Sequence, residues 1–189
     1  MEVLKIMNVL LINGSPHKKG CTYAALNEVS KVLKEYKINS EILDIGKKSI
    51  HPCTACMKCK KTGKCKYGGL PNKILKKMIK FDAVVLGSPV CYGGPTGALC
   101  ANLDRVCFSI TPKELKGKLG ASIVVTHYKD SGATLDRLNQ YFLSTKMELV
   151  ETSKDNVLIC HKVKDFKKNE EGLKNLKILA ESIAENLKK

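Results

Sequence analysis

Two apolar runs of this chain end in the same tripeptide, Gly-Ser-Pro, and this feature constrains the fold most. The first run, residues 6–13, leads into Gly14-Ser15-Pro16, and the second, residues 83–87, ends at Gly87 and leads into Ser88-Pro89. A short apolar run that stops at a turn signal is typical of a buried strand in a parallel sheet. We therefore predict two such strands, each followed by an irregular loop.

Strands and helices alternate along the rest of the chain. Apolar periodicity predicts helices over 22–36, 71–79, 96–107, 134–142 and 169–187, and further strands over 40–45, 119–126 and, with an interruption, 148–150 and 156–160. This order predicts an α/β fold, a doubly wound five-stranded parallel sheet with helices on both faces. We expect one domain over residues 1–189, with a cysteine-rich loop at 46–70 inserted after the second strand.

The inserted loop carries four thiols within thirteen residues. They are spaced C-x2-C-x2-C-x5-C, at Cys53, Cys56, Cys59 and Cys65. A compact run of this kind is a usual sequence form of an iron–sulfur ligand set. A structural zinc site more often divides its ligands into two separated pairs, so zinc is the alternative. Disulfides are disfavoured because we expect a cytoplasmic protein, since residues 1–13 lack the pattern of a signal peptide.

The net charge of +15 at pH 7 raises the question of nucleic-acid binding. The lysines are dispersed along the chain, which is typical of a solvated surface, and anionic cofactors would offset part of their charge. No stretch approaches the roughly 18–20 apolar residues of a membrane span. We therefore expect no nucleic-acid partner and no membrane partner, and the remaining charge suits an acidic protein partner.

Three loops at the expected carboxyl ends of strands carry residues that suit a bound nucleotide. Ligands of a doubly wound sheet bind beyond these ends. The first loop offers a phosphate glycines, hydroxyls and the start of a helix. The second loop has a backbone fixed by prolines and glycines, which can lie along a flat ring. The third loop adds further polar and aromatic groups. The predicted cofactor contacts are Ser15, His17, Lys18, Gly20, Cys21 and Thr22, then Ser88, Pro89, Val90, Cys91, Tyr92 and Gly93, then Thr126 and His127. FMN, with a phosphate at one end and a planar ring at the other, would touch all three loops.

The same loops resemble those of the flavodoxin-like NAD(P)H-dependent FMN reductases. Members carry G-S-P followed by a Gly and a Thr, then S-P-x-Y, then Asp-Arg. The matching residues here are Gly14-Ser15-Pro16 with Gly20 and Thr22, Ser88-Pro89 with Tyr92, and Asp104-Arg105. The four cysteines narrow the resemblance to the archaeal iron–sulfur flavoproteins.

The resemblance implies a flavodoxin-like fold with FMN on the strand ends and a [4Fe–4S] cluster on Cys53, Cys56, Cys59 and Cys65. It also implies a homodimer or dimer of dimers, in which a ferredoxin-type donor reduces the cluster and the cluster passes electrons to FMN in a neighbouring subunit. The cofactors would then carry the chemistry, so no catalytic nucleophile or acid–base pair is expected. We expect Lys58, Lys60, Lys61 and Lys64, which surround the thiols in sequence, to stabilise the reduced cluster.

Two other functions compete with this one. The first is an NAD(P)H-dependent flavin or quinone reductase whose cysteine loop is structural or binds zinc. The second is a zinc- or nucleic-acid-binding module, which only the charge suggests. The remaining thiols Cys100, Cys107 and Cys160 lie in apolar stretches and are expected to pack in the core.

Overall fold

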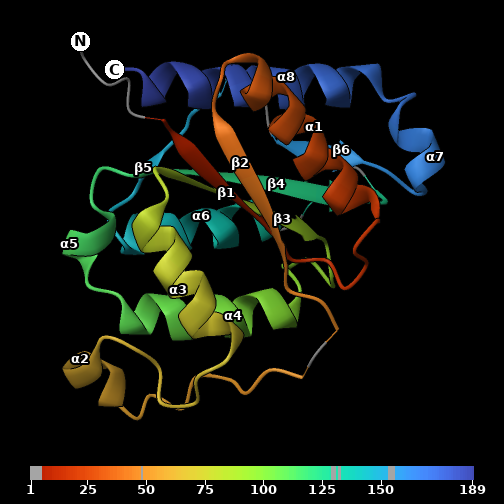
Figure 1. The fold of residues 1–189 in the computed structure, drawn as a ribbon. Coiled ribbons are helices and arrows are strands. Elements are labelled where there is room, and N and C mark those ends of the chain that lie inside the picture. The colour runs from red at the N-terminus through yellow and green to blue at the C-terminus, as the bar shows by residue number, and fades with distance from the viewer. Residues whose placement is uncertain (1–5, 48, 129–130, 132, 153–155) are drawn as a thin grey trace.

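The computed structural model describes residues 6–47, 49–128, 131, 133–152 and 156–189 (Figure 1). Its centre is a parallel sheet in the order β2-β1-β3-β4-β5, with β6 also paired to β4. The strands are β1 (Asn8–Asn13), β2 (Asn39–Asp44), β3 (Ala83–Pro89), β4 (Leu119–Thr126), β5 (Glu148–Leu149) and β6 (Val157–Ile159). This order confirms the predicted doubly wound parallel sheet.

The fifth position of the sheet is shared by two short strands. β5 pairs with Leu119 and Gly120 at the beginning of β4, and β6 pairs with Val124 to Thr126 at its end. The interruption predicted between residues 150 and 156 is therefore real. The sheet therefore has six strands in five positions.

Helices cover both faces of the sheet and enclose two cores. α1 (Cys21–Glu35) and α8 (Glu170–Leu187) lie on one face, and α3 (Leu70–Lys80), α4 (Gly97–Ser109) and α6 (Thr134–Ser144) lie on the other (Figure 1). Val9 and Leu11 of β1 belong to the first core, while Leu10 and Ile12 belong to the second. Because both faces of β1 are buried, its sequence is continuously apolar instead of alternating.

Three short helices were not predicted, namely α2 (Lys58–Thr62), α5 (Pro112–Leu115) and α7 (Val163–Phe166). A helix of four or five residues is too short to display an apolar period. The 46–70 segment was expected to be a loop throughout, and α2 corrects this expectation. Among the described residues, no helix is both long and apolar enough to cross a membrane.

Candidate functional site

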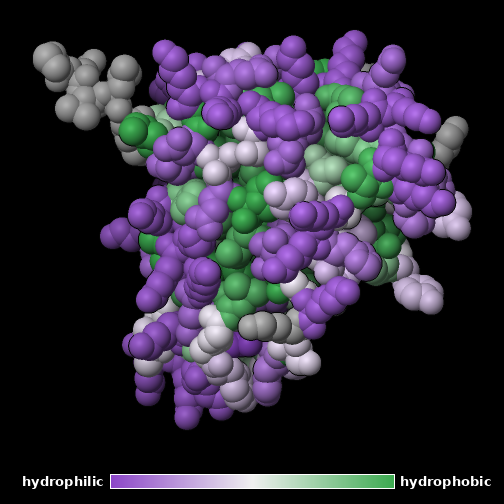
Figure 2. Space-filling model, turned by 45° about the vertical axis from the view of Figure 1, so that its right-hand side comes forward, coloured by the Kyte–Doolittle hydropathy of each residue, from purple (hydrophilic) through white to green (hydrophobic). Residues whose placement is uncertain are grey.

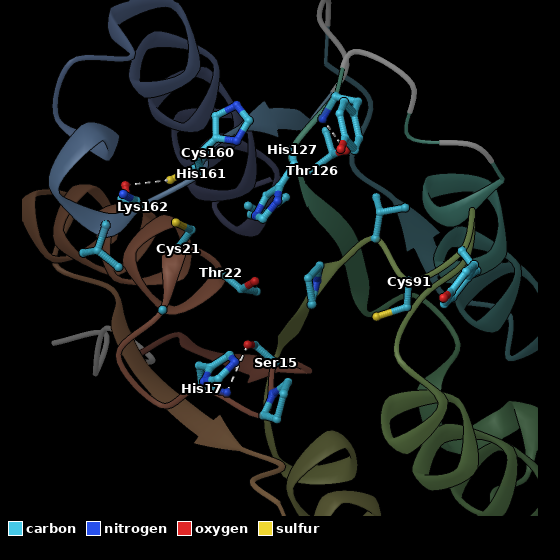
Figure 3. A pocket seen from close by; sticks show the side chains of 18 of the residues that line it. Ser15, His17, Cys21, Thr22, Cys91, Thr126, His127, Cys160, His161 and Lys162 are labelled. Atoms are coloured by element: carbon cyan, nitrogen blue, oxygen red, sulfur yellow. Dashed lines mark hydrogen bonds between the residues drawn. The ribbon is translucent and has the colours of Figure 1, made fainter.

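A cavity of about 1020 Å³ opens at the carboxyl edge of the sheet (Figure 3). The three loops predicted to meet there do meet, since each contributes to its lining. Twelve predicted contacts line it: Ser15, His17, Gly20, Cys21, Thr22, Pro89, Val90, Cys91, Tyr92, Gly93, Thr126 and His127. Part of the third loop, residues 129, 130 and 132, lies outside the described residues.

Two predicted contacts lie elsewhere. Lys18 lines a neighbouring basic hollow of about 620 Å³, together with Lys19 and Lys47. Ser88 is fully buried, and its hydroxyl accepts a hydrogen bond from the Thr96 N–H (3.1 Å) and donates one to the Pro89 carbonyl (2.8 Å). Ser88 therefore holds the second loop together from behind the cavity.

The first loop is folded by its own side chains. The Ser15 N–H donates to Asn13 Oδ1 (3.1 Å), and the His17 N–H donates to Ser15 Oγ (3.1 Å). Gly20 then begins α1, and no described side chain caps this end of the helix. The first N–H groups of α1 are therefore left for water or for an anionic ligand in the cavity.

Close backbone contacts join the first and second loops. The Gly14 N–H donates to the Gly87 carbonyl (2.7 Å), and a Cβ on Gly14 would lie 2.8 Å from that carbonyl oxygen. Thr96 adds a second link, because its hydroxyl donates to the Gly14 carbonyl (2.7 Å). The two Gly-Ser-Pro segments are thus side by side because glycine allows their backbones to touch.

The second loop ends in a tight turn at the rim of the cavity. Cys91 and Gly94 exchange two backbone hydrogen bonds, of 2.7 and 3.1 Å, around Tyr92 and Gly93. Both central residues have positive φ, 49° and 76°, as a type I′ turn requires. Tyr92 is fully exposed at the tip, so its ring is free to contact a ligand or a second protein.

Sequence reasoning missed the segment that follows β6. Cys160, His161, Lys162 and Val163 also line the cavity. Cys160 is buried in the core, as expected, but it also faces the cavity beside Cys21 (Figure 3). Burial, together with the neighbouring Cys21 thiol, raises the pKa of Cys160 to about 12. The rule that ligands bind beyond carboxyl strand ends would have found this segment if it had been applied to the fifth strand.

The four clustered cysteines line a second cavity of about 10 Å³, which is room for about one water molecule. Cys53, Cys56, Cys59 and Cys65 all line it, and all nine cysteines of the chain are free thiols. Tyr67, Arg105 and Phe108 complete part of the wall. Among the described residues, none lines both cavities.

Side chains from two helices hold the cysteine segment, residues 46–70, in place. Arg105 of α4 donates to the carbonyls of His51 (3.2 Å) and Gly68 (2.6 Å) and to Cys65 Sγ (3.2 Å). The Asn72 amide of α3 bonds both the N–H and the carbonyl of Cys65. The ends and the last thiol of the segment are thereby attached to the sheet-covering helices.

The backbone around Cys56 is wound tightly. Ala55 and Met57 have φ of 48° and 59°, a left-handed conformation that costs energy for residues other than glycine. A hydrogen bond from the Lys58 backbone N–H lowers the pKa of the Cys56 thiol, and the positive charge of Lys66 acts in the same direction. The loop therefore makes the Cys56 thiol more acidic than an ordinary cysteine.

The four cysteines are the donor set of an iron–sulfur cluster, but their thiols are not gathered around one common point. Within the described part of the chain, no three His, Cys, Asp or Glu residues come close enough together to hold one metal ion. An iron–sulfur cluster places each of its cysteine ligands on a different iron, so its thiolates stay farther apart than those around one zinc ion. His51 is not arranged as a ligand, because its ring stacks on Tyr67 with centroids 4.0 Å apart.

Comparisons with known proteins agree with this arrangement. Residues 7–161 match the NADPH-dependent FMN reductase family. An iron–sulfur flavoprotein of Methanocaldococcus jannaschii is 30% identical over 96% of this chain and 98% of its own length. A second one from the same organism is 31% identical over 75% of this chain and 73% of its length.

Solved structures bear out the flavodoxin-like fold. An archaeal flavodoxin superposes with a TM-score of 0.65 over 97% of this chain and 100% of its own, at 15% sequence identity. The family match covers most of the chain, and the first relative is similar over nearly its whole length. The chain therefore belongs to the NADPH-dependent FMN reductase family, in the group of the iron–sulfur flavoproteins.

Proposed function

We propose that this chain is an electron-transfer protein that takes electrons from a ferredoxin-type donor through a [4Fe–4S] cluster to FMN, and from there to an acceptor. Its family gives it a flavin-based redox role. The observation that carries the finer proposal is the pair of separate cavities, one at the carboxyl edge of the sheet and one enclosed by four thiols. The cysteine segment is then a cofactor-binding insertion in a single flavin-binding domain.

The properties of the larger cavity suit FMN. Its volume of about 1020 Å³ is at the upper end of the usual range for cofactor sites. The uncapped start of α1 and the hydroxyls of Ser15 and Thr22 offer donors to a phosphate. The backbone of the second loop, from Pro89 to Gly93, would lie along the ring system.

Cys53, Cys56, Cys59 and Cys65 would hold the cluster, and the segment that carries them would open to admit it, because the cavity between them is only about 10 Å³. When bound, the cluster supplies one-electron transfer, and FMN couples single electrons to two-electron reduction. The protein binds both groups and fixes their surroundings. Lys58, Lys60, Lys61 and Lys64 are exposed beside the thiols, and their charge would favour the more negative, reduced state of the cluster.

An acidic electron donor suits the surface around the cysteine segment. The basic segment, residues 45–81, contains eleven lysines and no Asp or Glu. The lysines are dispersed along the whole chain, but this segment contains no acid of its own, and Lys77 pairs with Glu41 of β2. Hydrophilic side chains cover the corresponding end of the molecule (Figure 2). Met57, Tyr67 and Phe108 add partly exposed apolar surface there, so a carboxylate-rich redox protein would find both charge and contact area.

The separation of the two sites supports the oligomeric part of the proposal, which the family resemblance implies. No described residue lines both cavities, so no single residue would contact both cofactors of one chain and connect them for electron transfer. In a homodimer or dimer of dimers, the cluster of one subunit would face the FMN of its neighbour. Tyr92, exposed at the cavity rim, would then be covered by the second subunit.

Cofactor analysis of anaerobically purified protein is the first test. We expect four irons, four acid-labile sulfides and one FMN per chain. Cys65→Ala should lose iron and retain FMN, because the two cavities do not share residues. One zinc and no iron in the wild-type protein would refute the cluster.

Stopped-flow reduction by an acidic ferredoxin tests the donor. Lys60→Glu, Lys61→Glu and Lys64→Glu together should slow the second-order rate at low salt by about 10-fold or more, and 0.5 M salt should narrow the difference. The matched control carries Lys167→Glu, Lys168→Glu and Lys174→Glu, which change the net charge equally at exposed sites outside the basic segment. Equal slowing by the control would show that only net charge matters.

The basic hollow beside the flavin cavity supports a second candidate, an NAD(P)H-dependent reductase. Lys18, Lys19 and Lys47 line it next to His17, which lines both hollows. A pyridine nucleotide could place its phosphates on these lysines with its ring over the flavin. Rapid flavin bleaching by NADPH, with none by reduced ferredoxin, would favour this function.

A further inference from the structure

Arg105 is a charged side chain in an unusual setting. Its residue is only 3% exposed, and it is one of just two arginines among 33 basic residues, the other being Arg137. Burying a guanidinium is costly unless an anion accompanies it. In the described part of the chain, no carboxylate lies within salt-bridge distance of Arg105.

The neighbouring acid is already engaged elsewhere. The Asp104 carboxylate accepts a hydrogen bond from the Tyr141 hydroxyl (2.6 Å) and lies 3.4 Å from the Arg137 guanidinium. The sequence offers no other candidate nearby, because no Asp or Glu occurs between Asp44 and Asp82. The groups around Arg105 are carbonyls, the Tyr67 ring and the Cys65 sulfur.

The missing anion can therefore come from the thiols. Arg105 points Nε at Cys65 Sγ, and the other three cysteines line the same small cavity. Four thiolates around a cluster carry net negative charge, which increases when the cluster gains an electron. A lysine would not do the same work, because only the guanidinium fork can reach two carbonyls and a sulfur at once.

We propose that Arg105 is a positioning residue for the cluster: it is the buried counter-charge of the four thiolates and raises their cluster's reduction potential. This inference rests on the proposed function, because it requires that the cysteines hold a cluster. The two carbonyl bonds fix the guanidinium against the segment, and the bond to sulfur puts its charge next to a ligand. Hydrogen bonds to ligand sulfurs and nearby cations are among the factors that set such potentials.

The test compares Arg105→Gln and Arg105→Lys with Arg137→Gln as the matched control, in the complete chain with both cofactors. We expect Arg105→Gln to lower the midpoint potential in an EPR-monitored titration and to release iron to a chelator about 10–100-fold faster. Arg105→Lys should stay closer to the wild type in midpoint potential than in iron retention. It keeps the positive charge but loses the planar guanidinium that bonds several acceptors at once. Arg137→Gln should change neither.

Thermal unfolding separates a counter-charge from a purely structural arginine. In the metal-free protein, Arg105→Gln loses the hydrogen bonds to the His51 and Gly68 carbonyls but also removes a buried charge that lacks its anion, so Tm should fall less than in the loaded protein. In the cluster-loaded protein, the same substitution should lower Tm. An equal drop in both forms, or an unchanged potential in an iron-loaded Arg105→Gln protein, would overturn the inference. A wild-type protein without iron would instead refute the proposed function itself.

Discussion

The side-chain amide of Asn72 bonds to both backbone polar groups of Cys65. Asn72 Oδ1 accepts from the Cys65 N–H at 2.9 Å, and Asn72 Nδ2 donates to the Cys65 carbonyl at 2.9 Å. Asn72 lies in the first turn of α3, whereas Cys65 lies in irregular backbone. The last cysteine of the motif is therefore held by a helix as well as by its own loop, in which the Gly68 N–H donates to the Cys65 carbonyl (3.0 Å).

Asn72→Ala should reduce the iron content without affecting FMN. The substitution leaves the part-buried Cys65 N–H without a partner, at about 1–3 kcal/mol, while the Cys65 carbonyl keeps its hydrogen bond from the Gly68 N–H (3.0 Å). Asn72→Asp should be intermediate, because a carboxylate can accept from the N–H but cannot donate to the carbonyl. Iron and FMN per chain after anaerobic reconstitution check this order.

The control is Asn186→Ala, an exposed amide that bonds to the Ser182 carbonyl near the end of α8. It removes a similar side chain far along the chain from the cysteines. If Asn72→Ala kept its full iron content, the amide would have no part in positioning Cys65.

Thr96 links helix capping to the flavin cavity. Its hydroxyl caps α4 by accepting from the Leu99 N–H (3.3 Å) and donates to the Gly14 carbonyl (2.7 Å). Thr96→Val should lower the free energy of unfolding by about 0.5–2 kcal/mol. It should also weaken FMN binding by about two- to tenfold, because the first loop loses its link to the second.

Thr96→Ser keeps the hydroxyl and should restore both properties. Denaturant unfolding gives the first and fluorescence titration of the flavin-free protein gives the second. A loss of stability with unchanged FMN affinity would mean that the link does not shape the cavity.

Gly120 tests the packing beneath the sheet. A Cβ at this position would lie 2.5 Å from Cγ of Phe142, which is only 1% exposed. Gly120→Ala should therefore destabilise the protein by about 1–3 kcal/mol through overpacking. Gly97→Ala is the control, because a Cβ there meets no atom within 4 Å, and its effect should stay within about 0.5 kcal/mol.

The sheet and its helices were predictable because their signals are local. Residues 9–12 are apolar without interruption since both faces of β1 are buried, and any chain segment in that position would look similar. Four thiols within thirteen residues likewise stay near one another whatever the position of their segment in the fold. The twelve predicted contacts that line the larger cavity follow from one rule about carboxyl strand ends.

The missed features depend on contacts between residues distant in the sequence, or on backbone conformations that the residue type does not predict. Arg105 matched a motif, but its bonds to His51, Cys65 and Gly68 cross 37 to 54 positions. Ala55 and Met57 adopt left-handed backbone without being glycine, so the turns around Cys56 left no sequence signal. A strand over 156–160 was predicted, but the cavity-lining segment 160–163 that follows β6 contains no glycine or proline to mark it as a loop.

Tyr141 gives a prediction on pH. Burial, together with the hydrogen bond to Asp104, raises the pKa of Tyr141 well above its usual value near 10. Its protonated hydroxyl therefore contributes stability in full below about pH 10, and this contribution is lost as the pH rises from there towards the pKa of the folded state. The free energy of unfolding should fall above pH 10 in the wild-type protein.

Tyr141→Phe should remove that part of the pH dependence. At pH 7 it should cost about 1.5–3 kcal/mol, because the hydroxyl bonds a carboxylate at 2.6 Å. Tyr128→Phe is the control, since its residue is 77% exposed, and it should match the wild type at every pH. Denaturant unfolding between pH 7 and 11 measures both, and an equally steep fall in Tyr141→Phe would assign the alkaline loss of stability to other groups.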